Sequence, residues 1–301
     1  MAYRYEFATE QDGEEIARLL EDEEFKGEIS IAYCRRPNAV LSLARDGDKS
    51  VFVTAKDDDG RIVAVGACVI KGDVAYLTGL RAVKRVNIPK CYEMLREFCA
   101  ENSVKLTYTT ILADSVGVQA MLEKKRANMP YYLKHSECVI NIIRKNLKVK
   151  DENKLIKDGD SKVKDENKLI KDGDSYVLNN AIGEELARGK AVEQWDYKQY
   201  VVKRYGWKLR LAKRFLKWMP NENEVLKFFT LRDVTTKDNA SLESFLRHAS
   251  RLPLEGGFFL YGGAFCPVKS IKYRSIVYIV DWDKNIEDVS KIQFSVEIAD
   301  L

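Results

Sequence analysis

The sequence lacks long apolar runs and contains very little histidine. No stretch of its 301 residues approaches the roughly 20 consecutive apolar residues that a membrane-spanning helix needs. The N-terminal residues MAYRYEFATEQDGEE become acidic where a secretory signal peptide would become apolar. We therefore expect a cytoplasmic protein that does not enter a membrane. The only histidines, His135 and His248, have no serine or cysteine partner at motif spacing, so we expect neither a histidine metal site nor a hydrolase triad.

The six cysteines contain no CxxC pair, which argues against the usual zinc and redox motifs. Most of them have apolar neighbours in the sequence, which is typical of reduced, buried thiols. They are Cys34, Cys68, Cys91, Cys99, Cys138 and Cys266. We expect no disulfide bond and no metal ion.

The overall composition is that of a folded globular protein. Apolar residues make up 46% and charged residues 32%, which is too apolar for a disordered chain. The net charge of +4 is too small to indicate a nucleic-acid-binding protein by itself. Since the chain exceeds the usual size of one domain, we expect two domains of roughly 120 to 150 residues each.

The first half of the chain alternates strand and helix patterns. The segments SVFVTAKD, GRIVAVGACVI and VAYLTGLRAV are joined by the turn signals DDDG and KGD, which predicts an antiparallel meander of three strands. A helix, a strand, a second helix and a last strand follow. Strand, helix and strand at this spacing usually connect neighbouring parallel strands. We expect a mixed α/β domain over residues 1–146.

A 14-residue segment, KVKDENKLIKDGDS, occurs at 148–161 and is repeated without change at 162–175. Each copy is highly charged and has too few apolar residues to form a core. We interpret 147–180 as a linker or a protruding hairpin. Residues 181–301 close with a pattern that is similar to the end of the first half, so we expect a second, degenerate domain of the same fold.

The segment GLRAVKRVNIPKCYEML, residues 79–95, runs from a strand into a helix through a loop that contains no glycine. The first turn of a helix exposes free N–H groups and the positive end of the helix dipole, which can bind a phosphate group. Lys84, Arg85 and Lys90 add positive charge here. We interpret this loop as a candidate pyrophosphate site.

Most of residues 3–143 resemble the GCN5-related N-acetyltransferase superfamily. The resemblance is carried by YLTGLRAVKR, by the helix after it, by TYTTILADSVGVQAMLEKKRANMPYY and by the order of elements. Members with two such domains in tandem are the most similar, since CRRPNAVLSLARDG and YRSIVYIVDWD also resemble them. The resemblance implies a mixed sheet flanked by helices, with acetyl-CoA as co-substrate. It places the acetyl-CoA on Leu80, Arg81, Lys84, Arg85, Val86, Asn87, Ile88, Lys90 and Cys91.

The loop departs from the family pattern Q/R-x-x-G-x-G/A. Pro89 and Cys91 stand where the pattern has glycines, and Val86 stands at the Q/R position. Pro89 has no N–H to donate, and the added side chains prevent the close backbone approach that glycine allows. We expect fewer backbone donors and more cations than the family usually offers to a diphosphate. The alternative is a solvated connection that binds no ligand.

Amine acetylation needs a base for the acceptor ammonium and an acid for the thiolate that leaves. In the family the acid is often a tyrosine in the helix of VGVQAMLEKKRA, but Leu122 stands at that position here. We expect Tyr131 or Tyr132 in the next strand to replace it, with core packing as the alternative role.

Further residues are candidate acceptor contacts, because they lie on strands expected to face the cleft or in the segment that covers the acceptor site in relatives. They are Glu28, Tyr33, Arg35, Arg36, Tyr76, Thr78 and Tyr108. Core packing and a solvated surface are the alternative roles for these side chains.

The stretch from Tyr197 to Trp218 contains eight Lys and Arg residues and no acidic residue. If this stretch is a helix, one face carries four apolar side chains with cations beside them. The four are Trp207, Leu211, Phe215 and Trp218. Packing of this stripe into the second domain is our first interpretation. Contact with RNA or another polyanion, or with an anionic membrane, is the alternative.

We expect an acetyl-CoA-dependent N-acetyltransferase whose acceptor is the amine of a small molecule or peptide, with its activity in the first domain. The first alternative is a non-catalytic protein that kept the fold for binding or assembly, which the missing glycines, the missing tyrosine and the degenerate second domain support. Binding of nucleic acid or another polyanion through residues 197–218 is the third alternative.

Overall fold

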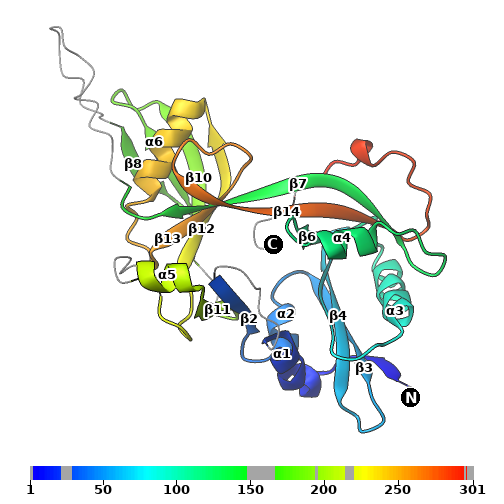
Figure 1. The fold of residues 1–301 in the computed structure, drawn as a ribbon. Coiled ribbons are helices and arrows are strands. Elements are labelled where there is room, and N and C mark those ends of the chain that lie inside the picture. Colours follow the sequence, from blue (N-terminus) through cyan, green and yellow to red (C-terminus); the bar gives the residue numbers. More distant parts are fainter. Residues whose placement is uncertain are drawn as a thin grey trace, which may run out of the picture. The chain divides into compact units, whose positions relative to one another are not determined.

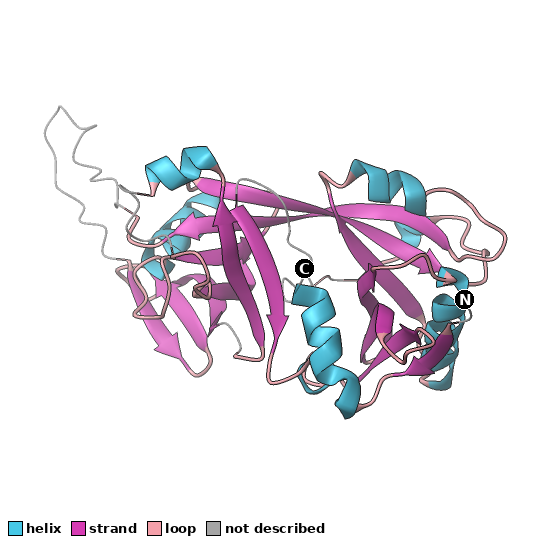
Figure 2. Ribbon diagram, turned by 60° about the horizontal axis from the view of Figure 1, so that its bottom comes forward, coloured by secondary structure: helices cyan, strands magenta, loops and turns pink. Residues whose placement is uncertain are grey.

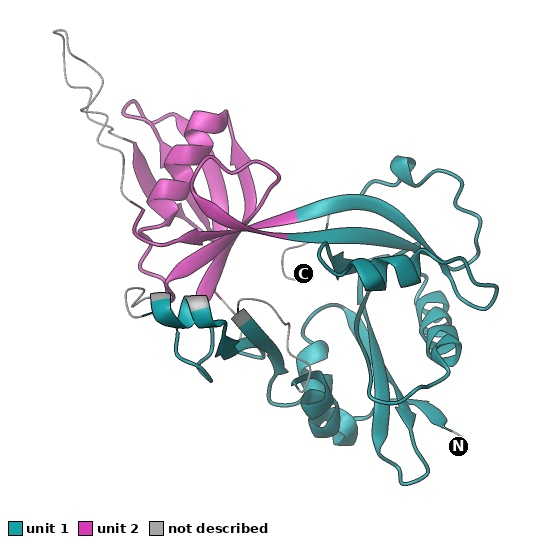
Figure 3. Ribbon diagram, viewed as in Figure 1, with its two compact units in different colours: residues 1–138, 195–226, 274–301 teal, residues 139–194, 227–273 magenta. Residues whose placement is uncertain are grey.

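The computed structural model describes residues 3–21, 29–147, 167–193, 196–213, 220–294 and 296. The chain forms two compact units, and each is built from segments that are far apart in the sequence (Figure 3). Unit 1 consists of Met1–Cys138, Trp195–Leu226 and Arg274–Leu301, and unit 2 of Val139–Gln194 and Lys227–Tyr273. This division differs from the contiguous one expected from the sequence, in which 1–146 and 181–301 are separate domains.

Unit 1 contains a mixed sheet with the strand order β1-β3-β4-β5-β6-β14-β7 (Figure 1). The strands are β1 Arg4–Phe7, β3 Lys49–Lys56, β4 Ile62–Lys71, β5 Val74–Ala82, β6 Leu106–Leu112, β14 Ser270–Asp281 and β7 Tyr131–Arg144. The antiparallel pairs β3–β4 and β4–β5 form the meander, as predicted. The parallel pairing of β5 with β6 is also confirmed. The C-terminal strand β14 pairs with β6, which places the last part of the chain inside this sheet.

Helices lie on the faces of this sheet (Figure 2). They are α1 Gly13–Glu21, α2 Ala39–Leu43, α3 Ile88–Glu101 and α4 Val116–Leu122, with short 3₁₀ helices η1 Glu10–Asp12 and η3 Val289–Lys291. Strand β4 is buried on both faces because successive side chains point in opposite directions. Val65 and Val69 pack with α1 and α2, whereas Cys68 and Ile70 pack with α3. Within the described residues, no helix is long and apolar enough to cross a membrane.

A separate two-stranded ribbon in unit 1 corrects the prediction of a basic helix over 197–218. Lys198–Tyr205 is strand β11, which pairs antiparallel with β2 Ile29–Arg35. This stretch contains aromatic and β-branched residues that favour a strand, and Gly206 separates it from the short helix α5 Trp207–Ala212. The exposed fractions of Trp207 and Leu211 are 71% and 62%, so these two side chains do not pack as expected. Residues 214–219, including Phe215 and Trp218, lie outside the described part of the chain.

The described residues of unit 2 form a sheet with the order β7-β13-β12-β10-β9-β8 and one helix. Its elements are β8 Lys168–Asp172, β9 Ser175–Asn179, β10 Glu185–Glu193, β12 Phe228–Thr236, α6 Asn239–Ala249 and β13 Phe258–Gly262. The core of unit 2 includes the stacked rings of Phe229 and Phe259, with centroids 5.1 Å apart. Parallel β12 and β13 joined by α6 repeat the strand, helix, strand pattern of unit 1. The interpretation as a tandem pair of domains stays a prediction.

Part of the duplicated segment is structured. The second copy, 162–175, supplies strand β8, which forms a hairpin with β9 through a turn at Gly173. The first copy, 148–161, lies outside the described residues.

Candidate functional site

Strands β5 and β6 are paired only at their beginnings. Their parallel register ends where Tyr76 of β5 meets Tyr108 of β6. Beyond this point β5 continues along β4 to Ala82, whereas β6 continues along β14 to Leu112. The two central strands therefore diverge, and their facing backbone groups no longer bond to one another.

A β-bulge interrupts β5 immediately after this divergence. Thr78 pairs with Ala67 and Arg81 pairs with Val65, so Gly79 and Leu80 together stand opposite one residue of β4. Gly79 has φ +64°, in the left-handed region that favours glycine. A bulge frees backbone groups from the ladder and redirects the strand. The bulge therefore interrupts the regular ladder of β5 beside the opening between the strands.

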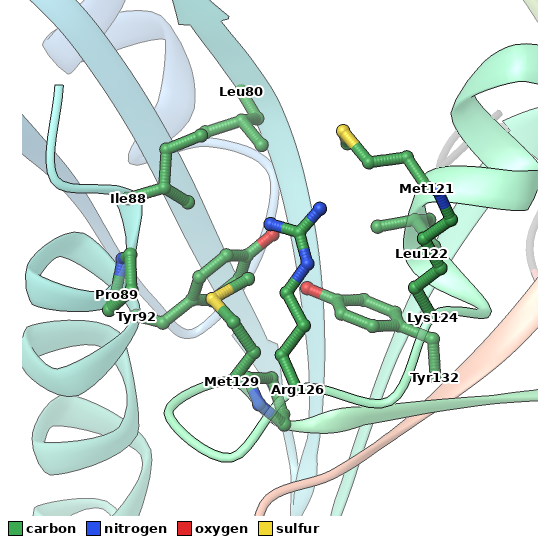
Figure 4. A pocket seen from close by; sticks show the side chains of 11 residues that line it. Leu80, Ile88, Pro89, Tyr92, Met121, Leu122, Lys124, Arg126, Met129 and Tyr132 are labelled. Atoms are coloured by element: carbon green, nitrogen blue, oxygen red, sulfur yellow. The ribbon is translucent and has the colours of Figure 1, made fainter. Parts of the chain in front are cut away.

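A narrow cavity of about 50 Å³ lies beside the bulge, between the end of β5, the start of α3, the end of α4 and the start of β7 (Figure 4). Its wall is mostly apolar, and its two charged residues are cations. It is lined by Leu80, Ile88, Pro89, Tyr92, Met121, Leu122, Lys124, Arg126, Met129, Pro130 and Tyr132. A usual small-molecule site has roughly 300–1,000 Å³, so this cavity alone has room for only a narrow part of a ligand.

Two tyrosines supply the polar groups inside this cavity. The hydroxyls of Tyr92 and Tyr132 both point toward the guanidinium group of Arg126 (Figure 4). Tyr132 is buried, and its hydroxyl has no hydrogen-bond partner among the described residues. Burial raises the pKa of Tyr132 well above its usual value, and the neighbouring Tyr92 raises it further. Tyr132 is therefore held in its protonated form, with the hydroxyl of Tyr92 close enough to compete for its proton.

The structure brings only part of the predicted cofactor set to this cavity. Leu80 and Ile88 line it. Val86 packs against the apolar cluster around Val63, and Cys91 is buried in the core, which raises the pKa of its thiol to about 11. The guanidinium of Arg81 donates to the carbonyl of Leu80 over 2.8 Å.

Two of the three loop cations are engaged with carboxylates. Lys84 lies 2.8 Å from Asp57, and Lys90 lies 2.7 Å from Glu93. These ion pairs raise the pKa of each lysine, chiefly through the hydrogen bond to the carboxylate. Arg85 is exposed, and no carboxylate of the described residues pairs with it.

The loop backbone is partly engaged as well. The N–H of Asn87 donates to the hydroxyl of Tyr5 over 2.8 Å. Pro89, the second residue of α3, has no N–H to offer. The helix terminus therefore presents fewer free donors than a family glycine loop would.

The cations nearest to the cavity come instead from the segment between α4 and β7. Lys124 and Arg126 belong to the sequence LEKKRANMPYY, which carried part of the family resemblance. Their position beside the cavity was not predicted, because the sequence does not show that this segment faces the start of α3. The run of three basic residues at the end of the predicted helix VGVQAMLEKKRA is the signal that could have indicated it.

The two tyrosines considered as the acid differ in their surroundings. Tyr132 points into the cavity, whereas the ring of Tyr131 has the ammonium groups of Lys125 and Lys284 over it, 5.0 Å and 5.1 Å from its centroid. Tyr131 does not line the cavity. Tyr132 is thus the better placed of the pair.

Several predicted acceptor contacts cluster at the divergence of β5 and β6. The rings of Tyr76 and Tyr108 are stacked with centroids 5.0 Å apart, and the hydroxyl of Tyr76 is hydrogen-bonded to Thr110 over 2.9 Å. Tyr33 is close enough to Tyr76 to interact electrostatically with it. Thr78, two residues along β5 from Tyr76, is half-buried.

The charged members of that predicted set lie elsewhere or cannot be placed. Arg35 is buried and lies 2.8 Å from Asp46 in an internal ion pair. Arg36 pairs with Glu21 at the surface. Glu28 lies outside the described residues.

The corresponding position in unit 2 is unfavourable for an anion. The side chain of Asp238 caps α6 and accepts from the N–H of Ser241 over 2.7 Å. A carboxylate at this helix terminus uses the donor and the positive charge that a phosphate would need. Helix α3, which follows β5 in unit 1, has Asn87 at its N-cap and no such acidic cap.

No family model and no curated protein matches the sequence. Solved structures match its fold. A GCN5-related glucosamine N-acetyltransferase region of a fungal multi-domain GH3 beta-N-acetylglucosaminidase matches with TM-score 0.56 and 12% identity, over 92% of this chain and 38% of that chain. A GCN5-related N-acetyltransferase from Sphaerobacter thermophilus matches with TM-score 0.52 and 8% identity, over 92% and 95% of the two chains.

N-myristoyltransferase of Saccharomyces cerevisiae with bound myristoyl-CoA matches with TM-score 0.48 and 10% identity, over 93% of this chain and 83% of that chain. Identities this low show the fold alone. The chain has the fold of the GCN5-related N-acetyltransferases, which confirms the predicted fold class.

Proposed function

We propose that the protein is an acyl-CoA-dependent N-acyltransferase whose site lies in unit 1, where β5 and β6 diverge. The observation that carries this proposal is the buried hydroxyl of Tyr132, which faces an apolar cavity without a partner. An unpaired buried donor costs free energy, so the site suits a ligand that supplies an acceptor. The sulfur of a thioester, which becomes a thiolate as it leaves, is such an acceptor.

The residues of the cavity fit the parts of a CoA thioester. The apolar wall formed by Leu80, Ile88 and Met129 suits the slender arm that leads to the sulfur. Lys124 and Arg126, with Arg85, would hold the phosphates, because Lys84 and Lys90 are already paired. Binding would depend on side-chain charge more than on the backbone donors of a glycine loop. Acetyl-CoA is the donor that we propose first.

The acyl transfer would use groups from β5 and β7. Backbone N–H groups freed at the Gly79–Leu80 bulge are suited to stabilise the negative charge that develops on the thioester oxygen. As the new C–N bond forms and the C–S bond breaks, the Tyr132 hydroxyl would donate to the leaving sulfur, and the amine nitrogen would lose a proton to water. Tyr76, Tyr108 and Thr110 form a wall with hydroxyl groups that we propose for the acceptor amine.

One observation favours the non-catalytic alternative. Lys84, Lys90 and the N–H of Asn87 are satisfied within the protein, so the loop itself has lost much of its capacity for phosphate. Under that alternative the cavity would bind no CoA thioester at all. Binding therefore separates the two functions before any acceptor is known.

The deciding experiment is calorimetric titration of acetyl-CoA and of CoA into the purified full chain, followed by a screen of primary amines for release of CoA. Micromolar binding with amine-dependent release supports the enzyme. Neither heat nor thermal stabilisation at millimolar ligand would overturn it and leave the non-catalytic alternative.

A further inference from the structure

Two thiol groups face each other in the core of unit 1. Cys68 lies on β4 and Cys99 lies in the last turn of α3, and their sulfur atoms are 3.7 Å apart. Their exposed fractions are 0% and 3%. The contact follows from the fold, because the alternation along β4 points Cys68 toward α3. The two residues are 31 positions apart, so their meeting could not be read from a spacing motif.

We propose that Cys68 and Cys99 form a redox modification site, in which a hydroperoxide converts the two thiols into a disulfide that joins β4 to α3. This inference does not depend on the proposed acyltransferase function. A disulfide needs a sulfur separation of about 2.05 Å, so the two atoms must approach by roughly 1.7 Å. Side-chain rotation with a small shift of one helical turn can supply a movement of that size.

Cys99 is the thiol better suited to react first. The hydrogen bond from the Cys68 thiol lowers the pKa of Cys99 against the opposing effect of burial, and the Thr107 hydroxyl lowers it further. Trp282 supports this arrangement, because its indole N–H donates to the Thr107 oxygen over 2.9 Å. The hydroxyl proton of Thr107 therefore stays available for the sulfur of Cys99. Thiolate character and a second thiol nearby both favour reaction with a peroxide, and solvent access is the further condition.

The position of Cys99 also provides access. Helix α3 ends at Glu101, and the ends of helices open more readily than their middles. The side chain of Asn102, which donates to the carbonyl of Phe98 over 2.7 Å and accepts from Lys49, holds this turn from outside. The N–H groups of Asn102 and Val104 also donate to the carbonyl of Cys99, over 3.2 Å and 3.1 Å. Opening of this one turn would expose Cys99 to a molecule as small as hydrogen peroxide.

The reaction balances with the hydroperoxide as the only oxidant. The Cys99 thiolate attacks the terminal oxygen of the hydroperoxide, so an S–O bond forms, the O–O bond breaks, and the other oxygen leaves as water or an alcohol after taking a proton. The Cys68 sulfur then attacks the sulfur of Cys99. The S–S bond forms, the S–O bond breaks, and the hydroxide that leaves takes the thiol proton of Cys68 as water. Two thiols have then lost two electrons to one hydroperoxide.

Cys91 is a matched internal control. It lies on the same helix and is also buried, but burial raises the pKa of its thiol to about 11 and no described thiol lies within hydrogen-bonding distance of it. Trypsin separates the three cysteines, because cleavage after Lys and Arg yields peptides 62–71, 91–96 and 97–105 with one cysteine each.

The test is treatment of the folded full chain with hydrogen peroxide, then alkylation, tryptic digestion and mass spectrometry. We expect peptides 62–71 and 97–105 to be recovered joined, with the loss of two hydrogen atoms, and separated again by a reducing agent. Peptide 91–96 should be recovered alkylated. In Cys68→Ala the oxidised Cys99 should stop as a sulfenic acid that dimedone labels.

The contrary result is equally clear in the wild-type protein. If both peptides are recovered alkylated at a dose that already oxidises the partly exposed Cys138 and Cys266, the proposal is wrong. Joining of either peptide to 91–96 instead would also overturn it. Neither outcome depends on whether a cysteine variant folds.

Discussion

The rings of Tyr92 and Tyr132 meet edge to face, with centroids 6.2 Å apart, and their hydroxyls point toward Arg126 (Figure 4). Tyr92 comes from the first turns of α3 and Tyr132 from the start of β7, so the pair connects the two elements on either side of the cavity. Burial raises the pKa of both tyrosines, which keeps both as donors. A ligand that reaches this point meets two donors and a guanidinium group, so it must bring acceptors or negative charge.

Replacement of Tyr132 by Phe should separate catalysis from stability. The ring and its packing remain, and an unsatisfied buried hydroxyl is removed, so we expect the free energy of unfolding to stay within about 1 kcal/mol or to rise. If the hydroxyl donates to the leaving sulfur, acyl transfer should fall by about 10²-fold or more. Chemical unfolding and single-turnover rates measure the two effects.

The control is Tyr131→Phe, because that ring lies under Lys125 and Lys284 outside the cavity. It should leave the transfer rate within about two-fold, as expected for a residue without a role in the reaction. Equal losses in both variants would show that Tyr132 has no special part in the chemistry.

Two pairs of cations should affect CoA binding very differently. Lys124→Ala with Arg126→Ala removes the charges that line the cavity, and we expect the Kd for acetyl-CoA to rise by about 10-fold or more. Lys84→Ala with Lys90→Ala removes exposed cations that already pair with carboxylates, so the Kd should change by less than about three-fold. Titration at two salt concentrations measures both.

If the Lys84 and Lys90 variant raises the Kd more than the Lys124 and Arg126 variant, the phosphates bind at the loop between β5 and α3. In that case the ion pairs with Asp57 and Glu93 must exchange for the ligand. The loop predicted from the sequence would then be correct after all.

Gly79→Ala tests the bulge on β5. The space around Gly79 would accept a methyl group, since its nearest neighbours would lie 3.7 Å away, but its φ of +64° disfavours any side chain. We expect a loss of about 1–2 kcal/mol in the free energy of unfolding, or a shift of the bulge that lowers acyl transfer. Gly66→Ala is the matched control, because Gly66 lies opposite on β4 without a positive φ and a methyl there meets ordinary contacts from 3.6 Å. A smaller loss in Gly79→Ala than in Gly66→Ala would contradict a structural role for the bulge.

The sequence predicts local elements of this fold better than their long-range partners. Ile16, Leu19 and Leu20 show a helical period and are buried on one face of α1, as expected. Nothing near Lys198 in the sequence indicates that β11 pairs with β2, and without that partner the stretch was taken for a helix. The segment YRSIVYIVDWD carried part of the family resemblance, but the place of strand β14 beside β6 depends on contacts across the whole chain.

The candidate site shows the same limit. The strand, helix and loop around residues 79–95 were predicted, including the loss of backbone donors at Pro89. Lys84 and Lys90 are paired with Asp57 and Glu93, so they are not available for a phosphate. The sequence of the loop does not show which carboxylates lie beside its lysines.

The pH dependence of stability provides a last test of the buried hydroxyl. Tyrosine in an unfolded chain has a pKa of about 10, whereas burial holds the pKa of Tyr132 above that value in the folded protein. The folded chain therefore retains a proton that the unfolded chain loses, so the contribution of this group to stability is complete below about pH 10 and is lost as the pH rises further. Phe at position 132 has no proton to lose. We expect urea unfolding between about pH 9 and 11 to show a steeper loss of stability in the wild type than in Tyr132→Phe, with all other titrating groups held in common. Parallel curves for the two proteins would mean that the hydroxyl of Tyr132 is solvated in solution, and the acid proposed for the reaction would then have to be sought elsewhere.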